Sequence, residues 1–300
     1  MAKRRDWIIG LIIAGAFVVF SAVTVMFVAG LTQSDGTPFG TFGQRIAIVE
    51  LEGTITSSED VVRQLRRFAE DESVTGIVLR VDSPGGGVAA SQEIYNEVHR
   101  VRDEGKTVVV SMGSIAASGG LYVASAADWI VANPGTLTGS IGVILQFPTA
   151  ERLFDKIGLR YETVKSGELK DIGNISRDMT DKEADALQNV IDDTYDQFLT
   201  AVAEGRGLEK DTLRLVADGR IFTGRQALGY KIVDELGDLQ DAINAAADMT
   251  GLEIPPKTVR WEPRRRASIL DFLGRSALEW LLSASETESS PLLQYRFPGR

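Results

Sequence analysis

The sequence predicts an α/β protein in which helices flank a mostly parallel sheet. Short β-rich runs alternate with amphipathic helical segments along most of the chain, and this alternation is typical of parallel sheets. The composition is that of a globular protein, with 44% apolar and 25% charged residues among 300. Residues 45–256 contain no obvious linker, which predicts one domain of about 210 residues.

The individual elements follow from the spacing of apolar residues. Strands are expected at 45–52, 76–81, 107–111, 129–132 and 140–145. Helices are expected at 57–70, 89–102, 180–205 and in a last segment ending near Asp248. Ser57 with Asp60, and separately Thr180, supply capping signals for two of these helices. A small α/β unit is expected at 220–235, and 161–164 is strand-like.

An uncharged stretch at residues 7–31 lies close to the N-terminus. It exceeds the roughly 20 residues that an α-helix needs to cross a bilayer. The basic segment 1–6 precedes it, which predicts a cytoplasmic N-terminus, a single-pass anchor in the plasma (inner) membrane and an extracytoplasmic body. The alternative is a signal peptide cleaved near the small residues 28–30, but signal cores usually span about 7–15 residues. Residues 32–44 are rich in Gly, Ser and Thr and are predicted to form a linker.

Composition excludes several classes of function. The net charge is −10 and the body is acidic, which argues against a nucleic-acid partner. The chain has no cysteine, so disulfides, thiol catalysis and zinc–thiolate sites are excluded. Its one histidine, His99, excludes histidine-rich metal sites. We therefore expect neither a metal nor a cofactor.

Two glycine-rich segments each follow an expected strand. Residues 82–87 (DSPGGG) lack the spacing of phosphate-binding or dinucleotide-binding loops, and such a turn is often purely structural. Residues 112–121 (MGSIAASGGL) surround Ser118 with small residues, as an exposed nucleophile on a tight turn requires. The alternative for this second segment is a closely packed helix start, because Ala and Gly let elements approach.

A nucleophilic serine needs a general base. His99 has the pattern of a residue at the edge of a solvated helix face, and we do not expect it to be the base. A lysine serves as a base when burial favours its neutral amine, and Lys170 lies in a polar turn that contains glycine. From the residues alone, a solvated loop lysine is the simpler interpretation.

Taken in order, these features resemble one family. An N-terminal anchor, SPGGG after a strand, GSIAASGG, TGSIGV and KSGELKDIG together resemble the short, single-domain form of signal peptide peptidase A. This form belongs to peptidase family S49 of the Clp-protease/crotonase superfamily. The resemblance covers essentially the whole chain, and Asp82 departs from it because many relatives carry asparagine there.

The resemblance implies a fold, an assembly and a site. The fold would be the ClpP/crotonase-like ββα spiral, assembled into a homo-oligomeric ring, an octamer in known short members. Ser118 would be the nucleophile, Lys170 the general base and Ser140 the residue that orients the lysine amine. The oxyanion hole would combine the N–H of Gly119 with that of Gly85 or Gly86. In the family, serine and lysine come from adjacent protomers.

The implied activity is that of a serine endopeptidase that degrades remnant signal peptides in or at the membrane. Two related alternatives remain open, a membrane serine protease that cleaves a stomatin-like partner and an inactive anchored scaffold of the same fold. Retention of Ser118, Ser140 and Lys170 argues against the scaffold. A crotonase acting on acyl-CoA is disfavoured, because CoA is cytoplasmic.

Residues 257–300 are expected to form a C-terminal extension with two separate features. A basic triplet at 264–266 precedes an apolar helical pattern, which suits an interfacial helix, a contact with a neighbouring protomer or a helix covering its own core. The terminal segment 291–300 is apolar enough to be tied to the body, or to lie in the substrate groove as an autoinhibitory mimic.

Overall fold

The computed structural model describes residues 43–261 and 294–296. The chain divides into two compact units, Met1–Gly43 and Gln44–Arg300, and every described helix and strand belongs to the second. The predicted anchor, residues 7–31, therefore lies outside the described residues. Among the helices that the structure does describe, none is long and apolar enough to span a membrane.

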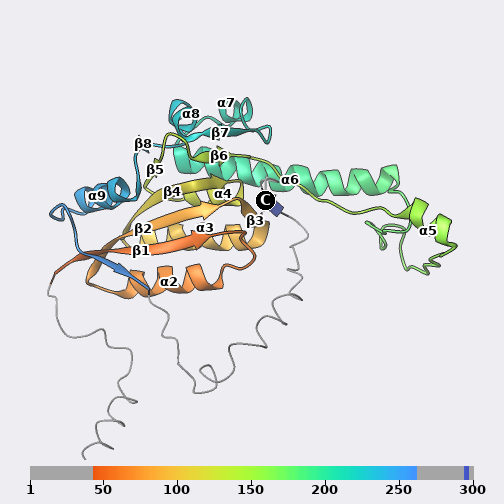
Figure 1. Cartoon of the computed structure of the whole chain (residues 1–300), viewed down its shortest axis with the longest axis horizontal. Helices are drawn as coiled ribbons and strands as arrows, with labels where there is room; N and C mark the ends of the chain where they lie inside the picture. The colour runs from red at the N-terminus through yellow and green to blue at the C-terminus, as the bar shows by residue number, and fades with distance from the viewer. Residues whose placement is uncertain (1–42, 262–293, 297–300) are drawn as a thin grey trace, which may run out of the picture. The chain divides into compact units, whose positions relative to one another are not determined.

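A mostly parallel sheet forms the body, which confirms the predicted α/β class (Figure 1). Its strands are β1 (Arg45–Glu52), β2 (Val74–Ser83), β4 (Thr107–Ala117), β5 (Trp129–Ala132), β6 (Leu137–Gly139), β7 (Ile221–Thr223), β8 (Glu235–Leu236) and β9 (Thr258–Arg260). The main path runs β7-β6-β4-β2-β1-β9, and β5 pairs with both β4 and β8. Within this sheet the β6–β7 pair is antiparallel and the other pairs are parallel.

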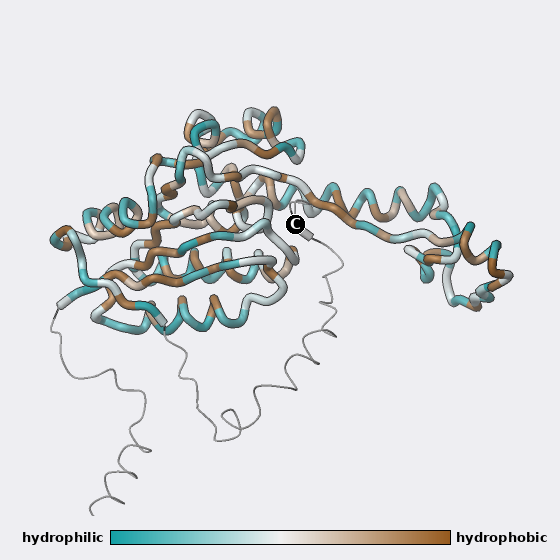
Figure 2. The backbone as a smooth tube through the Cα atoms, viewed as in Figure 1, coloured by the Kyte–Doolittle hydropathy of each residue, from teal (hydrophilic) through white to brown (hydrophobic). Residues whose placement is uncertain are grey.

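Helices cover both faces of the sheet, and buried apolar residues of its central strands belong to a core on each face. Figure 2 shows many hydrophobic residues along these strands. The larger core joins Ala47 and Val49 of β1 to helices α2 (Glu59–Glu70), α3 (Val88–Asp103), α4 (Gly119–Ala124) and α6 (Asp181–Arg206). The smaller core joins Ile46 and Ile48 to α9 (Leu239–Met249) on the opposite face. Shorter helices are α5 (Glu151–Ile157), α7 (Lys210–Arg214) and α8 (Gly224–Gly229).

The long helix α6 begins and ends as its sequence indicates. Thr180 accepts a hydrogen bond from the N–H of Glu183, whose side chain accepts one from Thr180 N–H, forming the predicted cap. Gly207 ends the helix in the left-handed conformation. Phe198 is fully buried in the C-terminal half, whereas Ala184 is exposed in the N-terminal half. That half therefore extends beyond the body.

Four local predictions were wrong or incomplete. The strand expected at 140–145 is absent, because the chain turns at Gly139 (φ 85°) and Ser140 (φ 53°) directly after β6. No strand forms at 161–164. Ser57 accepts the N–H of Glu59 at 3.2 Å, in keeping with its expected capping signal, but Ser58 is the N-cap of α2 and Asp60 pairs with Arg63 instead. The strand expected at 107–111 continues to Ala117 as β4.

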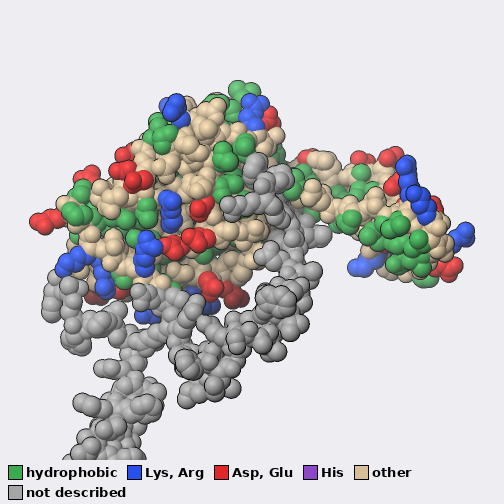
Figure 3. Space-filling view, viewed as in Figure 1, with side chains coloured by type: hydrophobic (Ala, Val, Ile, Leu, Met, Phe, Trp, Pro, Cys, Tyr) green, Lys and Arg blue, Asp and Glu red, His purple; other side chains and the backbone are tan. Residues whose placement is uncertain are grey.

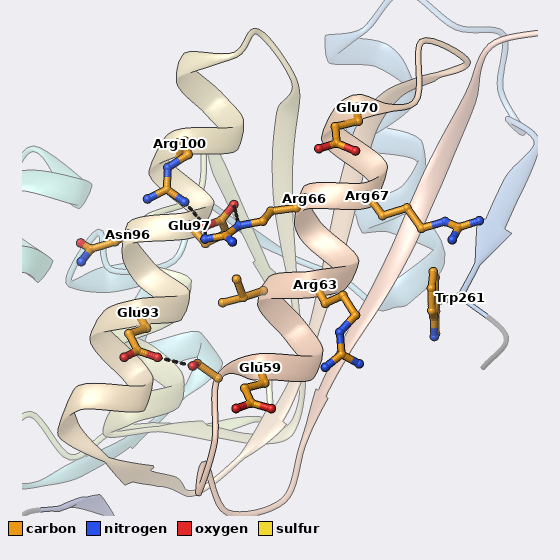
Figure 4. Close-up of a pocket in the computed structure, with 12 residues that line it drawn as sticks. Glu59, Arg63, Arg66, Arg67, Glu70, Glu93, Asn96, Glu97, Arg100 and Trp261 are labelled. Atoms are coloured by element: carbon orange, nitrogen blue, oxygen red, sulfur yellow. Dashed lines mark hydrogen bonds and ion pairs between the residues drawn. The ribbon is translucent and has the colours of Figure 1, made fainter. Parts of the chain in front are cut away.

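A buried carboxylate joins α2 to α3 (Figure 4). The side chain of Glu97 is 3% exposed and accepts hydrogen bonds from Nε and Nη2 of Arg66, each at 3.1 Å. Arg100, one turn along α3, pairs with the same carboxylate. Ser58 donates to Glu93 at the other end of the contact. The contact between α2 and α3 is therefore held by one carboxylate that pairs with two arginines.

Replacing Glu97 with glutamine is expected to lower the Tm by roughly 3–8 °C, because two arginines lose their buried carboxylate. Thermal unfolding measures the effect. Glu70→Gln removes an exposed carboxylate of α2 and should leave the Tm within about 1 °C. Equal shifts in the two variants would contradict a role for Glu97 in joining the helices.

Candidate active site

Ser118 occupies the turn between β4 and α4. Its backbone has φ 54° and ψ −119°, a conformation that residues with a side chain rarely adopt. The turn is fixed by Ser118 N–H donating to Gly139 O at 2.9 Å, and by Tyr122 N–H donating to Ser118 O at 2.8 Å. Ser118 is buried, and its Oγ has no hydrogen-bond partner among the described residues. The strained turn thus leaves the Ser118 hydroxyl without a hydrogen bond to the described residues, but buried, whereas the sequence predicts an exposed nucleophile.

Small residues let α4 approach the glycine-rich strand β3 (Gly85–Gly87). A Cβ on Gly119 would lie 2.5 Å from Ser91 Oγ and 3.2 Å from Gly86 N. A Cβ on Gly120 would lie 2.9 Å from Ser83 O. The first turn of the helix after Ser118 therefore lies directly against β3, as the composition of 112–121 indicates.

One edge of β3 is held by the loop that follows β1. Ile55 N–H donates to Gly85 O at 2.9 Å, and Gly87 N–H donates to Ile55 O at 2.7 Å. Gly86 must be a glycine, because a Cβ there would lie 2.2 Å from Ile55 O. Since Gly85 O and Gly87 N–H face Ile55, the N–H of the intervening Gly86 points to the opposite edge. Ile55 carried no sequence signal for this contact.

The opposite edge of β3 pairs with a strand from the end of the chain, β10 (Gln294–Arg296). The pairing is antiparallel, with the middle residue of β10, Tyr295, opposite Gly86. The terminal segment thus reaches the candidate site, whereas the predicted helix after 264–266 lies outside the described residues. The geometry shows that this edge of β3 accepts an extended peptide strand.

Ser140 lies next to Ser118 because β4 and β6 are parallel neighbours. Ala117 pairs with Gly139, so Ser118 and Ser140 are the next residues on adjacent strands. Both have positive φ, and Ser140 N–H donates to Arg220 O at 2.7 Å. The structure therefore brings Ser118 and Ser140 together at the ends of their strands, with the glycines of β3 packed against the residue after Ser118.

Lys170 belongs to a part of the structure that is separate from Ser118 and Ser140. It is exposed, in a series of turns within residues 147–180, which we call the arm. Figure 1 shows α5 and the adjoining turns of the arm at the far end of α6, away from α4 and β3. The structure therefore does not bring Lys170 to Ser118 within one copy of the chain.

Ion pairs give the arm a defined conformation around Lys170. Asp171 pairs with Lys165 and with Arg177, and Arg177 also pairs with Glu183 at the start of α6. A hydrogen bond from Lys165, and a smaller contribution from Arg177, hold the pKa of Asp171 well below its usual range. The hydrogen bond from Arg177 lowers the pKa of Glu183 to about 2. The sequence showed these charges, but not that they meet.

The lowered pKa values predict how the arm responds to acid. A carboxylate with a lowered folded-state pKa stabilises the fold above its ordinary pKa, here 4.5 for Glu183, and this stabilisation is lost as the pH falls toward about 2. Pepsin cleavage within the arm is therefore expected to increase across this window. Glu183→Gln should make the arm susceptible already at pH 5, and equal cleavage of both proteins at pH 5 would contradict the role of this pair.

The arm also carries an apolar surface near α5, visible in Figure 3. Leu153, Ile157 and Tyr161 are each more than half exposed, and Val164 is fully exposed. A contiguous apolar surface on a projecting segment is typical of a protein–protein contact. The exposed N-terminal half of α6 extends alongside it.

Most of the chain is similar to known proteases. The model of "Peptidase family S49" matches residues 100–253, and the "Clp protease" model matches residues 40–133, which supports the expected Clp-like fold. "Putative protease slr0021" of Synechocystis sp. is 40% identical over 84% of this chain and 96% of its own length.

Two other relatives are longer than the matched region. "Putative signal peptide peptidase SppA" of Enterococcus faecium is 35% identical over 74% of this chain and 64% of its own length. "Serine protease SPPA, chloroplastic" of Arabidopsis thaliana is 32% identical, and the chain spans 34% of its length. The family match covers both the turn of Ser118 and the arm. The chain therefore belongs to peptidase family S49 and is a serine peptidase.

Proposed function

We propose that the chain is a membrane-anchored serine endopeptidase that degrades remnant signal peptides through a Ser118–Lys170 dyad. The observation that carries this proposal is the buried Oγ of Ser118, which has no hydrogen-bond partner among the described residues. It lies on a strained turn packed against a glycine strand whose outer edge pairs with the extended segment β10. Residues 7–31 supply the anchor, residues 32–44 the linker and residues 45–256 the peptidase domain, which works outside the cytoplasm.

Gly86 and Gly119 are the oxyanion donors in this proposal. Gly85 N–H already donates to Ser83 Oγ at 3.1 Å, and Gly87 N–H donates to Ile55. Gly86 N–H instead points toward the peptide-binding edge, and its nitrogen lies close to Gly119. Two backbone N–H groups beside a nucleophile stabilise the negative charge that develops on the carbonyl oxygen.

The reaction uses the neutral amine of Lys170 as general base. The amine, oriented by Ser140, takes the proton of Ser118 as Oγ bonds to the scissile carbonyl carbon. The carbon–nitrogen bond breaks as the protonated lysine returns this proton to the leaving amine. Water, activated by the same amine, then hydrolyses the acyl-enzyme.

The dyad forms between two copies of the chain. Ser118 has no base among its described contacts, and Lys170 is exposed on an arm with an uncovered apolar surface. Docking of this arm onto a neighbouring body would cover that surface and deliver the amine to Ser118. A contact between different surfaces of identical chains forms a ring when the rotation between copies closes, and the family resemblance favours a closed octamer.

Signal peptides suit this site because β3 recognises backbone. A strand made of three glycines offers hydrogen bonds and no side chains, so it pairs with extended peptides of varied sequence. The anchor keeps the site beside the bilayer, where uncharged signal-peptide cores remain after preprotein cleavage. The name of the Enterococcus faecium relative agrees with this substrate class.

β10 would compete with such substrates, because it pairs with the same edge of β3. Removing residues 291–300 is expected to lower KM for a short apolar peptide by about 3–10-fold, with little change in kcat. Removing 297–300 alone leaves β10 in place and serves as the matched control. Equal KM values in the two truncated chains would contradict competition at this edge.

The test of the function is direct cleavage of a signal peptide. The full-length chain in detergent micelles is mixed with a synthetic signal peptide, and the products are identified by mass spectrometry. We expect cuts within the apolar core by the wild-type chain and none above background with Ser118→Ala. Cleavage of a stomatin-like protein, but not of the signal peptide, would overturn the substrate assignment.

A further inference from the structure

Ser83, the last residue of β2, connects three backbone segments behind the candidate active site. It is fully buried, and its Oγ donates to Gly53 O at 2.6 Å while accepting the N–H of Gly85 at 3.1 Å. Gly53 begins the loop that carries Ile55, and Gly85 begins β3. One hydroxyl therefore joins the end of β2, the loop after β1 and the glycine strand.

The position of β3 depends on contacts with neighbouring segments, because its own glycine residues restrict the backbone conformation little. Glycine lacks a Cβ and adopts many conformations with similar energies, so a run of three glycines does not fix the direction of its N–H groups. Gly85 has φ 96°, which a residue with a side chain would rarely adopt. Its N–H is held by Ser83 and its carbonyl by Ile55 N–H, so both peptide planes that flank it are fixed.

Fixing Gly85 on both sides determines where Gly86 N–H points. The carbonyl of Gly85 and the N–H of Gly86 belong to one planar peptide and are directed oppositely. With the carbonyl held toward Ile55, the Gly86 N–H faces the edge beside Gly119 and Ser118. Ser83 thus acts on the candidate oxyanion donor through the backbone, without touching a peptide bound at that edge.

We infer that Ser83 is a positioning residue for the oxyanion hole, which it orients by holding the Gly85 N–H. The inference rests on the proposed Ser118 chemistry, in which the donor matters most when the tetrahedral adduct forms. Loss of the Ser83 hydroxyl should therefore weaken binding of the transition state more than binding of the substrate.

The test compares Ser83→Ala with wild type in the full-length chain, using the peptidase activity that Ser118→Ala abolishes. We expect kcat to fall about 10–100-fold and KM to change less than about 2-fold. A peptide aldehyde, which forms a tetrahedral adduct with the serine, should lose affinity by the same factor as kcat/KM. Ser83→Thr keeps the hydroxyl and should recover most of kcat.

Ser125→Ala is the matched control. Ser125 is also fully buried, and its Oγ donates to Tyr122 O at 2.7 Å at the other end of α4. Ser125→Ala removes the same hydroxyl group at a position that does not contact β3, so kcat should remain within about 3-fold of wild type. Ser83→Cys keeps a side chain of similar shape, but its sulfur is a weaker hydrogen-bond acceptor. We expect this variant to fold even if Ser83→Ala does not, and its kcat to fall about 3–10-fold.

Two results would overturn the inference. Wild-type kcat in Ser83→Ala, or in Ser83→Cys where the alanine variant does not fold, would show that β3 needs no side-chain support. If Ser83→Ala loses affinity for the substrate and for the aldehyde by the same factor, the substitution disturbs the whole peptide-binding edge of β3. Neither result would affect the proposed function, which fails instead if Ser118→Ala retains activity.

Discussion

Replacing Lys170 with alanine lowers kcat by at least roughly 10³-fold, comparable to the effect of Ser118→Ala, because neither group of a nucleophile–base pair works without the other. Hydrolysis of an apolar fluorogenic peptide by the full-length chain measures the loss. Lys165→Ala is a useful comparison, since it removes a lysine of the same arm that pairs with Asp171. It should reduce activity far less than Lys170→Ala does.

Mixing the two inactive chains distinguishes a shared dyad from one within a single chain. When Ser118→Ala and Lys170→Ala chains are assembled together in equal amounts, about a quarter of the sites in a ring combine an intact serine with a neighbour's intact lysine. We expect activity near that fraction of wild type. An inactive mixture whose assembly mass matches wild type would show that serine and lysine must come from the same chain.

Much of the body follows from local sequence, because it depends on interactions close along the chain. The predicted strand 129–132 is β5 as the structure has it, and Thr180 caps α6 as expected. The fully buried central strands are recognisable because a sheet covered on both faces requires continuous apolar runs. Ser118 is a candidate from the sequence because a tight turn at a nucleophile requires small neighbours.

The remaining features depend on contacts between distant backbone segments. The sequence predicts a strand at 140–145, but two successive residues with positive φ, Gly139 and Ser140, end β6 there. Ile55 contacts β3 through main-chain atoms that every residue possesses, so its side chain gives no signal. Ser83 belongs to a recognisable motif, yet its partner Gly53 lies 30 residues away. Lys170 was predicted by resemblance, but its projecting arm was not.

Replacing Gly119 with alanine is expected to lower kcat by about 10²-fold, although alanine favours helices more than glycine does. Gly119 is a helical residue without positive φ, so the backbone itself tolerates a side chain. The obstacle is space, since the new Cβ would lie 2.5 Å from Ser91 Oγ and 3.2 Å from Gly86 N. Relieving the overlap moves β3, and with it the Gly86 N–H, away from Ser118.

Ser91→Ala in the same chain should recover about 10-fold of that loss, because it removes the atom nearest the new methyl group. Alone, Ser91→Ala loses its hydrogen bond to Gly87 O at 2.9 Å and should change kcat only about 2–3-fold. Gly135→Ala, where a Cβ would meet nothing within 4 Å, controls for the substitution itself. Failure of Ser91→Ala to rescue Gly119→Ala would mean that the remaining contacts with Gly85 and Gly86 displace the strand, and that β3 must lie as close to α4 as the glycine allows.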